Sequence, residues 1–222
     1  KYFSDTAIFN VFPPELAEKG DFLGKVLPMG STPVEKGLCG VANEEQIQFY
    51  FDGKAINAEP YELHQNIFSR NRGILETDKM DHMHVVILGC GSVGSLVAME
   101  LARSGVGHFL LADPDIMEYH NICRHQCGIE DVGDLKINAL KRKLLNINPQ
   151  AEVQTFEGIV QNIPKNMLDD FCVNNRTIFV GCADNRGADV YANRISIYYQ
   201  AAFLSIGFWE RAYACLLYTS PS

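Results

Sequence analysis

The stretch HVVILGCGSVGSLVAMELARSGVGHFLLADPDIMEYHNICR, residues 84–124, decides the fold. It opens with a short apolar run rich in β-branched residues, which is typical of a strand buried in a parallel sheet. Gly89, Gly91 and Gly94 follow in GxGxxG spacing. The first glycine permits a tight turn, the second lets the backbone approach a phosphate, and the third lets helix and strand pack closely. After an amphipathic helix and a second strand, Asp113 follows Gly91 at about the 20-residue spacing of a ribose-binding acid, so the stretch predicts a nucleotide site.

Strands and helices continue to alternate downstream. Apolar patterns predict a helix over 137–145, a strand over 151–156, a short helix over 167–171, a strand over 177–182, a helix over 190–198 and a strand over 202–206. Alternation of this kind implies right-handed βαβ crossovers. The predicted fold is therefore α/β, a Rossmann-like, doubly wound and mainly parallel sheet, preceded by a partial β-containing accessory segment.

The sequence divides into four predicted parts. Residues 1–57 contain an alternating pattern around Asp52-Gly53 and frequent proline and glycine, which predicts a β-hairpin in a fragment of an accessory module. Residues 58–83 are expected to form a polar helical connector, and 84–213 a nucleotide-binding domain that is truncated at its C-terminal end. Residues 214–222 fit no element and resemble translated read-through of a sequencing adapter, so we expect a non-native tail.

Composition narrows the class of protein. The 222-residue chain is 47% hydrophobic with a net charge of −8, which allows a sizeable core and argues against a general nucleic-acid-binding surface. Its seven cysteines include no CxxC pair, as suits a reducing cytoplasm, and Cys123 and Cys127 lack the second pair that a structural zinc site needs. Because no apolar run approaches about 20 residues, we expect no membrane association and a cytoplasmic location.

The residues after Asp113 fit a narrower pattern. Asp113-Pro114-Asp115, Asn121-Ile122-Cys123-Arg124, Lys136 and Ala183-Asp184-Asn185 follow in order, and Phe68-Ser69-Arg70-Asn71 precedes the glycine loop. Over residues 66–211 this order resembles the ThiF/MoeB family, the adenylyltransferases related to ubiquitin-activating enzymes. The resemblance implies ATP-dependent adenylation of a carboxylate, usually the C-terminal glycine of a ubiquitin-like or sulfur-carrier protein.

The same resemblance implies roles for polar side chains around the nucleotide. Asp113 would hold the ATP ribose, with Asp115 beside it in the cofactor site. Arg124 and Lys136 would bind phosphates and act in catalysis, and Asn121 would help to place them. Such a reaction requires mainly positioning and charge stabilisation from the protein.

Three further expectations come from the resemblance. The glycine loop, comprising Gly89, Gly91, Ser92 and Gly94, would lie against the nucleotide. Asp184 would act in catalysis by binding Mg²⁺, a hard cation that prefers carboxylate oxygens. Arg70 would reach the γ-phosphate in a neighbouring subunit, because these modules work as homodimers or pseudo-dimers.

Each of these side chains also has a structural alternative. Asp113 and Asp115 could cap a loop, Arg124 could form a surface ion pair, Asp184 could form a turn and Arg70 could be solvated. Lys136 opens a helix, where a cation is unfavourable to the helix dipole, so a phosphate role explains it better.

The sequence also departs from the family. His125 follows the motif arginine where the family commonly has glutamine, which leaves the roles of His125 and Gln126 open. Because the reaction needs no general base from the protein, we expect His120 and His125 at the surface. Neither the catalytic cysteine nor the zinc-binding CxxC pairs of some relatives is identifiable, and no cysteine nucleophile is predicted.

Other functions compete with adenylation of a protein. A nicotinamide-dependent dehydrogenase would explain the glycines and Asp113 but not Asn121, Arg124, Lys136 and Asp184 together. A non-catalytic partner subunit of a heterodimeric activating enzyme is a second alternative. In a third, the activated carboxylate belongs to a modified tRNA base.

Overall fold

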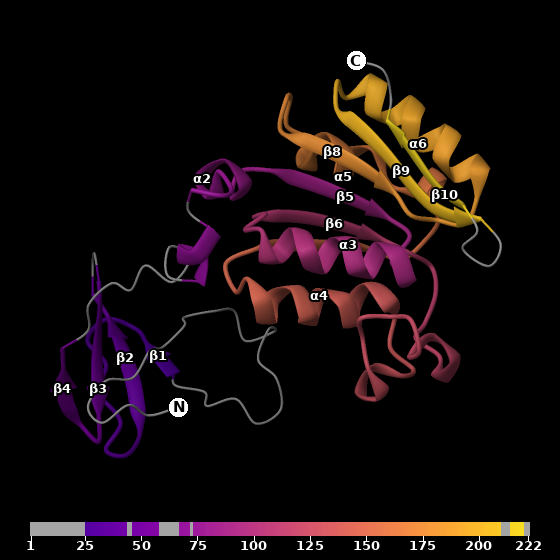
Figure 1. Ribbon diagram of the computed structural model, residues 1–222. Coiled ribbons are helices and arrows are strands. Elements are labelled where there is room, and N and C mark those ends of the chain that lie inside the picture. Colours follow the sequence, from indigo (N-terminus) through magenta and orange to yellow (C-terminus); the bar gives the residue numbers. More distant parts are fainter. Residues whose placement is uncertain (1–24, 44–45, 58–66, 72, 210–213, 220–222) are drawn as a thin grey trace. The chain divides into compact units, whose positions relative to one another are not determined.

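The computed structural model describes residues 25–43, 46–57, 67–71, 73–209 and 214–219 (Figure 1). The chain divides into two compact units, Lys1–Glu62 and Leu63–Ser222. No helix within the described residues is both long and apolar enough to cross a bilayer.

The first unit contains a four-stranded sheet in sequential order. Its strands are β1 (Lys25–Leu27), β2 (Leu38–Ala42), β3 (Ile47–Phe51) and β4 (Lys54–Ile56). β3 and β4 form the predicted hairpin, and both turn residues, Asp52 and Gly53, have positive φ angles of 48° and 74°. Two left-handed residues are what a tight two-residue hairpin turn requires, so aspartate and glycine suit it. β1 pairs with β2 in parallel, a feature that the sequence did not predict.

The second unit is built around a six-stranded sheet in the order β10-β9-β8-β5-β6-β7. Five strands are parallel: β5 (His84–Leu88), β6 (His108–Ala112), β7 (Glu152–Phe156), β8 (Thr177–Gly181) and β9 (Ala202–Trp209). β10 (Ala214–Thr219) pairs with β9 in the antiparallel direction. The predicted Rossmann-like, mainly parallel fold is confirmed.

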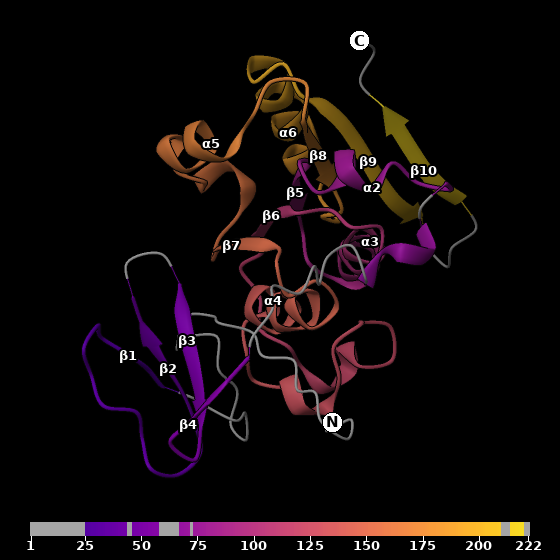
Figure 2. The ribbon, with the colours of Figure 1, turned by 90° about the vertical axis from the view of Figure 1, so that its left-hand side faces the viewer.

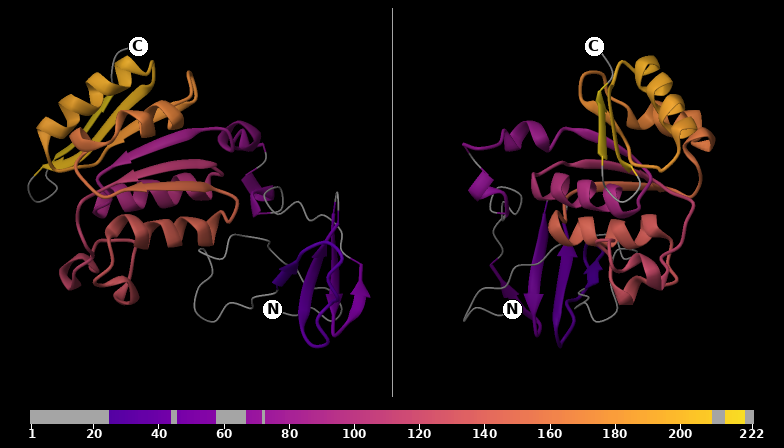
Figure 3. Two further views of the ribbon diagram at one scale, coloured as in Figure 1. Left: turned by 180° about the vertical axis from the view of Figure 1, so that it is seen from behind. Right: turned by 45° about the vertical axis from the view of Figure 1, so that its right-hand side comes forward.

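Helices cover both faces of this sheet (Figures 2 and 3). α3 (Ser92–Arg103) and α4 (Lys136–Ile147) pack on the face that carries Val85 and Ile87. α5 (Lys165–Phe171) and α6 (Arg186–Tyr198) pack on the opposite face, which carries Val86 and Leu88. Because successive side chains of a strand point to opposite faces, a continuous apolar strand is needed to fill both cores.

The connector before β5 is predicted to be helical over 58–83, and the structure describes only part of it. Residues 58–66 and 72 lie outside the described residues, and the described part contains helical Ile67, a 3₁₀ turn (Ser69–Asn71) and the four-residue α2 (Thr77–Met80). The helical connector therefore stays a prediction, whereas the prediction for the last residues is corrected. Residues 214–222 were expected to fit no element, yet Ala214–Thr219 form β10 and add a strand to the sheet.

The strand order determines where a ligand can bind. The chain passes from β5 to β6 and β7 on one side, and then crosses to β8 and β9 on the other side of β5. In open α/β sheets, such a reversal leaves a crevice beyond the carboxyl ends of the central strands, where ligands bind. Most of the predicted site residues follow β5, β6 and β8 at this edge.

Candidate functional site

The glycine loop after β5 has two packed glycines and one open glycine. Gly89 has a φ of 94°, and a Cβ there would lie 2.7 Å from the Ala183 backbone nitrogen. At Gly94, a Cβ would overlap the Gly89 carbonyl oxygen. At Gly91, nothing lies within 4 Å of the same position. The tight turn and the close helix packing are therefore confirmed, and the second glycine borders open space.

The N-terminus of α3 starts at this loop. Gly91 is its N-cap and no side chain caps the helix. The Ser92 hydroxyl donates to the Arg124 carbonyl oxygen at 3.1 Å. Uncapped N–H groups and the positive end of the helix dipole suit an anion such as a phosphate.

Asp113 joins the end of β6 to the glycine loop. Its carboxylate, in a residue only 6% exposed, accepts the Cys90 N–H at 2.6 Å and the Asp115 N–H at 2.8 Å. Burial raises the pKa of Asp113, while these two hydrogen bonds and the charge of Lys136 act in the opposite direction. A carboxylate has about four acceptor sites, so Asp113 can organise the loop and still accept a hydrogen bond from a ribose hydroxyl.

Lys136 opens α4 beside the same loop. Its Nζ lies 2.7 Å from Asp115 Oδ2, and its backbone N–H donates to the Asp115 carbonyl oxygen at 2.9 Å. The lysine side chain is 11% exposed and the aspartate side chain 61% exposed. A cation at a helix N-terminus needs an anionic partner, and Asp115 supplies one that a phosphate could replace.

Asn121 organises the turn that carries Arg124. Its Oδ1 accepts the Glu118 N–H at 2.9 Å, and its carbonyl oxygen accepts the Arg124 N–H at 3.0 Å. The Arg124 side chain is exposed and has no hydrogen-bond or ion-pair partner among the described residues. A guanidinium fixed at its backbone but without an internal partner is suited to bind an anionic ligand.

His125 corrects an expectation from the sequence. The prediction that it lies at the surface is wrong, because it is 8% exposed and contacts the glycine loop. Its Nε2 lies 2.7 Å from the Cys90 carbonyl oxygen, and its Nδ1 accepts the Cys127 N–H at 3.0 Å. Burial lowers the pKa of His125. His120 is exposed, as predicted, and its Nδ1 lies 3.2 Å from Glu118 Oε2.

Asp184 follows β8 at the same edge. The next residue, Asn185, caps α6 by accepting the N–H groups of Gly187 and Ala188. Asp184 is therefore not needed as the cap, and its exposed carboxylate has no partner within the described residues. No cluster of three or more His, Cys, Asp or Glu side chains that could hold a metal occurs in the described part of the chain. A cation at Asp184 would therefore need ligands from a bound substrate and from water.

The cysteines around the loop have the properties of buried thiols. Burial raises the pKa of Cys90, and it raises those of Cys127 and Cys182 to about 12. Burial likewise raises the pKa of Cys172, near the end of α5, to about 12. Because the thiolate is the nucleophilic form, these four side chains are poor nucleophiles at neutral pH.

Arg70 lies apart from the other site residues. The neighbouring Asn71 Nδ2 donates to the Arg103 carbonyl oxygen at 2.9 Å, which places this turn beside the C-terminal end of α3. α3 has 12 residues. Its length is therefore about 18 Å, and the glycine loop lies at its other end. Arg70 is thus remote from the candidate site of its own chain.

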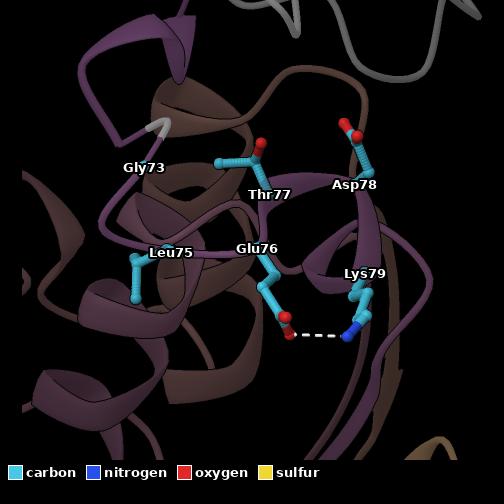
Figure 4. Close-up of a pocket in the computed structure, with 6 residues that line it drawn as sticks. All are labelled: Gly73, Leu75, Glu76, Thr77, Asp78 and Lys79. Carbon is cyan, nitrogen blue, oxygen red and sulfur yellow. Dashed lines mark hydrogen bonds and ion pairs between the residues drawn. The ribbon is translucent and has the colours of Figure 1, made fainter.

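A surface hollow near α2 is also remote from this edge. Figure 4 shows the residues that line it: Gly73, Leu75, Glu76, Thr77, Asp78 and Lys79. Lys79 Nζ forms an ion pair with Glu76 Oε2 at 2.8 Å. These residues precede β5, at the opposite end of the strand from the glycine loop, and none is a predicted site residue.

The sequence pattern of the ThiF family matches residues 63–212. The chain belongs to the ThiF family. Among curated relatives of this ThiF chain, the tRNA threonylcarbamoyladenosine dehydratase of Bacillus subtilis is 39% identical over 95 residues, covering 41% of this chain and 37% of the relative. The Sulfur carrier protein ThiS adenylyltransferase of B. subtilis is 32% identical over 112 residues, covering 48% and 32%.

A solved structure extends the comparison. The structure of E. coli MccB with AMPCPP and selenomethionine MccA is 29% identical, with a TM-score of 0.55, and the match covers 64% of this ThiF chain and 45% of that chain. The chain spans less than half the length of these relatives. The family and the Rossmann-like fold are therefore established.

Proposed function

We propose that this chain is the nucleotide-binding part of an adenylyltransferase that activates a carboxylate with ATP. The observation that carries the proposal is the edge of the sheet where an open glycine loop and Lys136 lie with two side chains that have no partner in the described part of the chain. Those side chains are Arg124 and Asp184. The similarity to a ThiS adenylyltransferase and to MccB, whose structure contains AMPCPP, supports the choice of ATP over NAD.

The proposed reaction needs little covalent chemistry from the protein. A carboxylate oxygen of the acceptor attacks the α-phosphorus of ATP, the bond to the bridging oxygen breaks, and pyrophosphate leaves. The product is an acyl-adenylate. The N-terminus of α3, Lys136 and Arg124 would stabilise the phosphate charge, and Asp113 would accept a hydrogen bond from the ribose.

Asp184 fits the requirements of a magnesium ligand. It offers a carboxylate that is exposed and not used as a helix cap. Mg²⁺ is commonly held in such sites by one or two carboxylates together with substrate phosphates and water. When bound, the ion would neutralise charge on the departing pyrophosphate.

A ubiquitin-like or sulfur-carrier protein is the acceptor that we favour. Relatives named as Ubiquitin-like modifier-activating enzyme 5 and as a ThiS adenylyltransferase support this class. The dehydratase similarity favours a second candidate, a carboxylate on a modified tRNA base. ATP–pyrophosphate exchange that requires tRNA, and not a carrier protein, would decide for the second candidate.

We further propose that the protein acts in the cytoplasm as a homodimer or pseudo-dimer. Asn71 holds the Arg70 turn at the far end of α3, about 18 Å from the glycine loop of its own chain. If Arg70 contacts a nucleotide, that nucleotide must therefore be bound to another subunit.

Calorimetric titration with ATP and with NAD, each with and without Mg²⁺, tests the proposed function. We expect saturable ATP binding that Mg²⁺ strengthens, and no comparable NAD binding. NAD binding without ATP binding would contradict the proposal and favour a dehydrogenase. ATP binding that Asp184→Ala leaves unchanged, with normal activity of a partner subunit, would favour a non-catalytic role.

A further inference from the structure

His125 joins two segments that are far apart in the sequence. The Cys90 carbonyl oxygen, which belongs to the glycine loop, accepts a hydrogen bond from Nε2, and Nδ1 accepts one from the Cys127 N–H. This pair of contacts requires a neutral imidazole with its proton on Nε2. The ring is therefore a bridge of defined polarity between the glycine loop and the turn after Arg124.

Two other hydrogen bonds hold the same turn against α3. The Ser92 hydroxyl donates to the Arg124 carbonyl oxygen, and the Gln126 N–H donates to Ser95 Oγ at 3.4 Å. Ser92 is half-buried, and Ser95 and His125 are both buried. The turn that carries Arg124 is thus held to the glycine loop and to α3, while the Arg124 side chain has no partner among the residues that the structure describes.

We infer that His125 is a positioning residue that holds Arg124 at the phosphate site through the Cys90 carbonyl oxygen. This inference rests on the proposed function. Preorganisation of a charged side chain reduces the entropy that is lost when it binds an anion. Removing the bridge would leave the guanidinium and the Ser92 and Ser95 hydrogen bonds in place but would hold the Arg124 backbone less firmly, so nucleotide binding would weaken.

The charged surroundings of His125 make the bridge sensitive to pH. Asp113 and Asp131 favour the protonated ring, while Lys136 and burial oppose it, and the Cys90 and Cys127 backbones contact the ring directly. Protonation would convert Nδ1 into a donor facing the Cys127 N–H, which cannot accept it. Acid should therefore break this bridge, loosen the turn and weaken ATP binding.

The test measures the Kd of the 222-residue chain for ATP by calorimetry. His125→Leu removes both hydrogen bonds, whereas His125→Gln retains one donor and one acceptor on a group that does not titrate. Arg124→Ala is made alone and together with His125→Leu. Thermal melting of each variant identifies loss of folding.

We expect His125→Leu to raise the Kd for ATP about tenfold, as two lost hydrogen bonds suggest, and His125→Gln to remain within about threefold of wild type. In the Arg124→Ala background, His125→Leu should have no further effect, because His125 acts through Arg124. As the pH falls below about 6.5, the wild type should lose more affinity for ATP than His125→Gln, because only the wild type carries a ring at this position that can be protonated.

An unchanged Kd in His125→Leu, or an additive effect in the Arg124→Ala background, would overturn the positioning role while leaving the proposed function intact. If His125→Leu fails to fold, the pH profile of His125→Gln decides: a profile identical to wild type overturns the inference. A wild-type chain that binds no ATP would refute the proposed function itself.

Discussion

Replacing Gly94 by alanine should destabilise the fold. The added Cβ would overlap the Gly89 carbonyl oxygen and would lie 3.3 Å from the Cys182 Cβ. A backbone oxygen cannot rotate away, so the N-terminus of α3 has to move away from the end of β5. Overpacking of this kind costs about 1–3 kcal/mol. In a domain of about 150–250 residues, the corresponding fall in Tm is roughly 2–12 °C.

Gly91 provides the matched control within the same loop. A Cβ there has nothing within 4 Å, and its φ of −76° is outside the left-handed region. Gly91→Ala should therefore change stability by no more than about 0.5 kcal/mol. Its methyl group would nevertheless occupy the space through which a phosphate approaches the backbone, so we expect the Kd for ATP to rise about tenfold or more.

Thermal melting and ATP calorimetry on both variants check this pair of predictions. The two substitutions should have different effects: a lower Tm for Gly94→Ala, and weaker ATP binding with a nearly unchanged Tm for Gly91→Ala. Equal destabilisation by the two substitutions would refute it. So would a Gly91→Ala variant that binds ATP as tightly as wild type.

Three further predictions concern charges and pH. Lys136→Met should weaken ATP binding about tenfold in calorimetry. It should cost only about 1 kcal/mol of stability, because its ion-pair partner Asp115 is largely exposed. A Kd for ATP equal to that of wild type would contradict the phosphate role of Lys136. Burial and His108 lower the pKa of His84, so the unfolded chain binds a proton at about pH 6.5 when the folded chain does not. Stability should accordingly fall as the pH drops below about 6.5, and urea unfolding should show a shallower loss for His84→Phe. In the proposed dimer, Arg70→Ala can be mixed with a second variant whose nucleotide site is defective but whose Arg70 is intact. Mixed dimers then contain one complete site, so about a quarter of the exchange activity should return, whereas no recovery would place Arg70 outside the partner's site.

The fold of the second unit could be predicted because each of its elements carries its own pattern. The apolar run of β5 and the helical spacing in α3 are local features, and the packing of the core agrees with both. The N-terminal unit was less predictable. Leu38–Ala42 has a central glycine and no clear alternation, so β2 and its parallel neighbour β1 were missed.

The candidate site could be predicted where a residue type is tied to a position in the motif. Asp113 follows β6 and Lys136 begins α4, as expected, and the structure brings both residues beside the glycine loop. His125 could not be predicted, because it lies between the exposed Arg124 and Gln126. Its burial depends on a carbonyl oxygen 35 positions earlier in the chain, and no local pattern reports such a contact.

The most direct test of the proposed function is ATP–pyrophosphate exchange by the full-length protein with Mg²⁺ and a carboxyl acceptor, either a ubiquitin-like protein or tRNA. Asp184→Asn removes the proposed metal ligand with little change in shape, and Asp170→Asn, on the exposed side of α5, is the control. The proposal predicts acceptor-dependent exchange that Asp184→Asn abolishes and Asp170→Asn retains. Exchange that Asp184→Asn leaves unchanged would contradict the proposal. So would the absence of exchange from a wild-type protein that binds ATP and the acceptor.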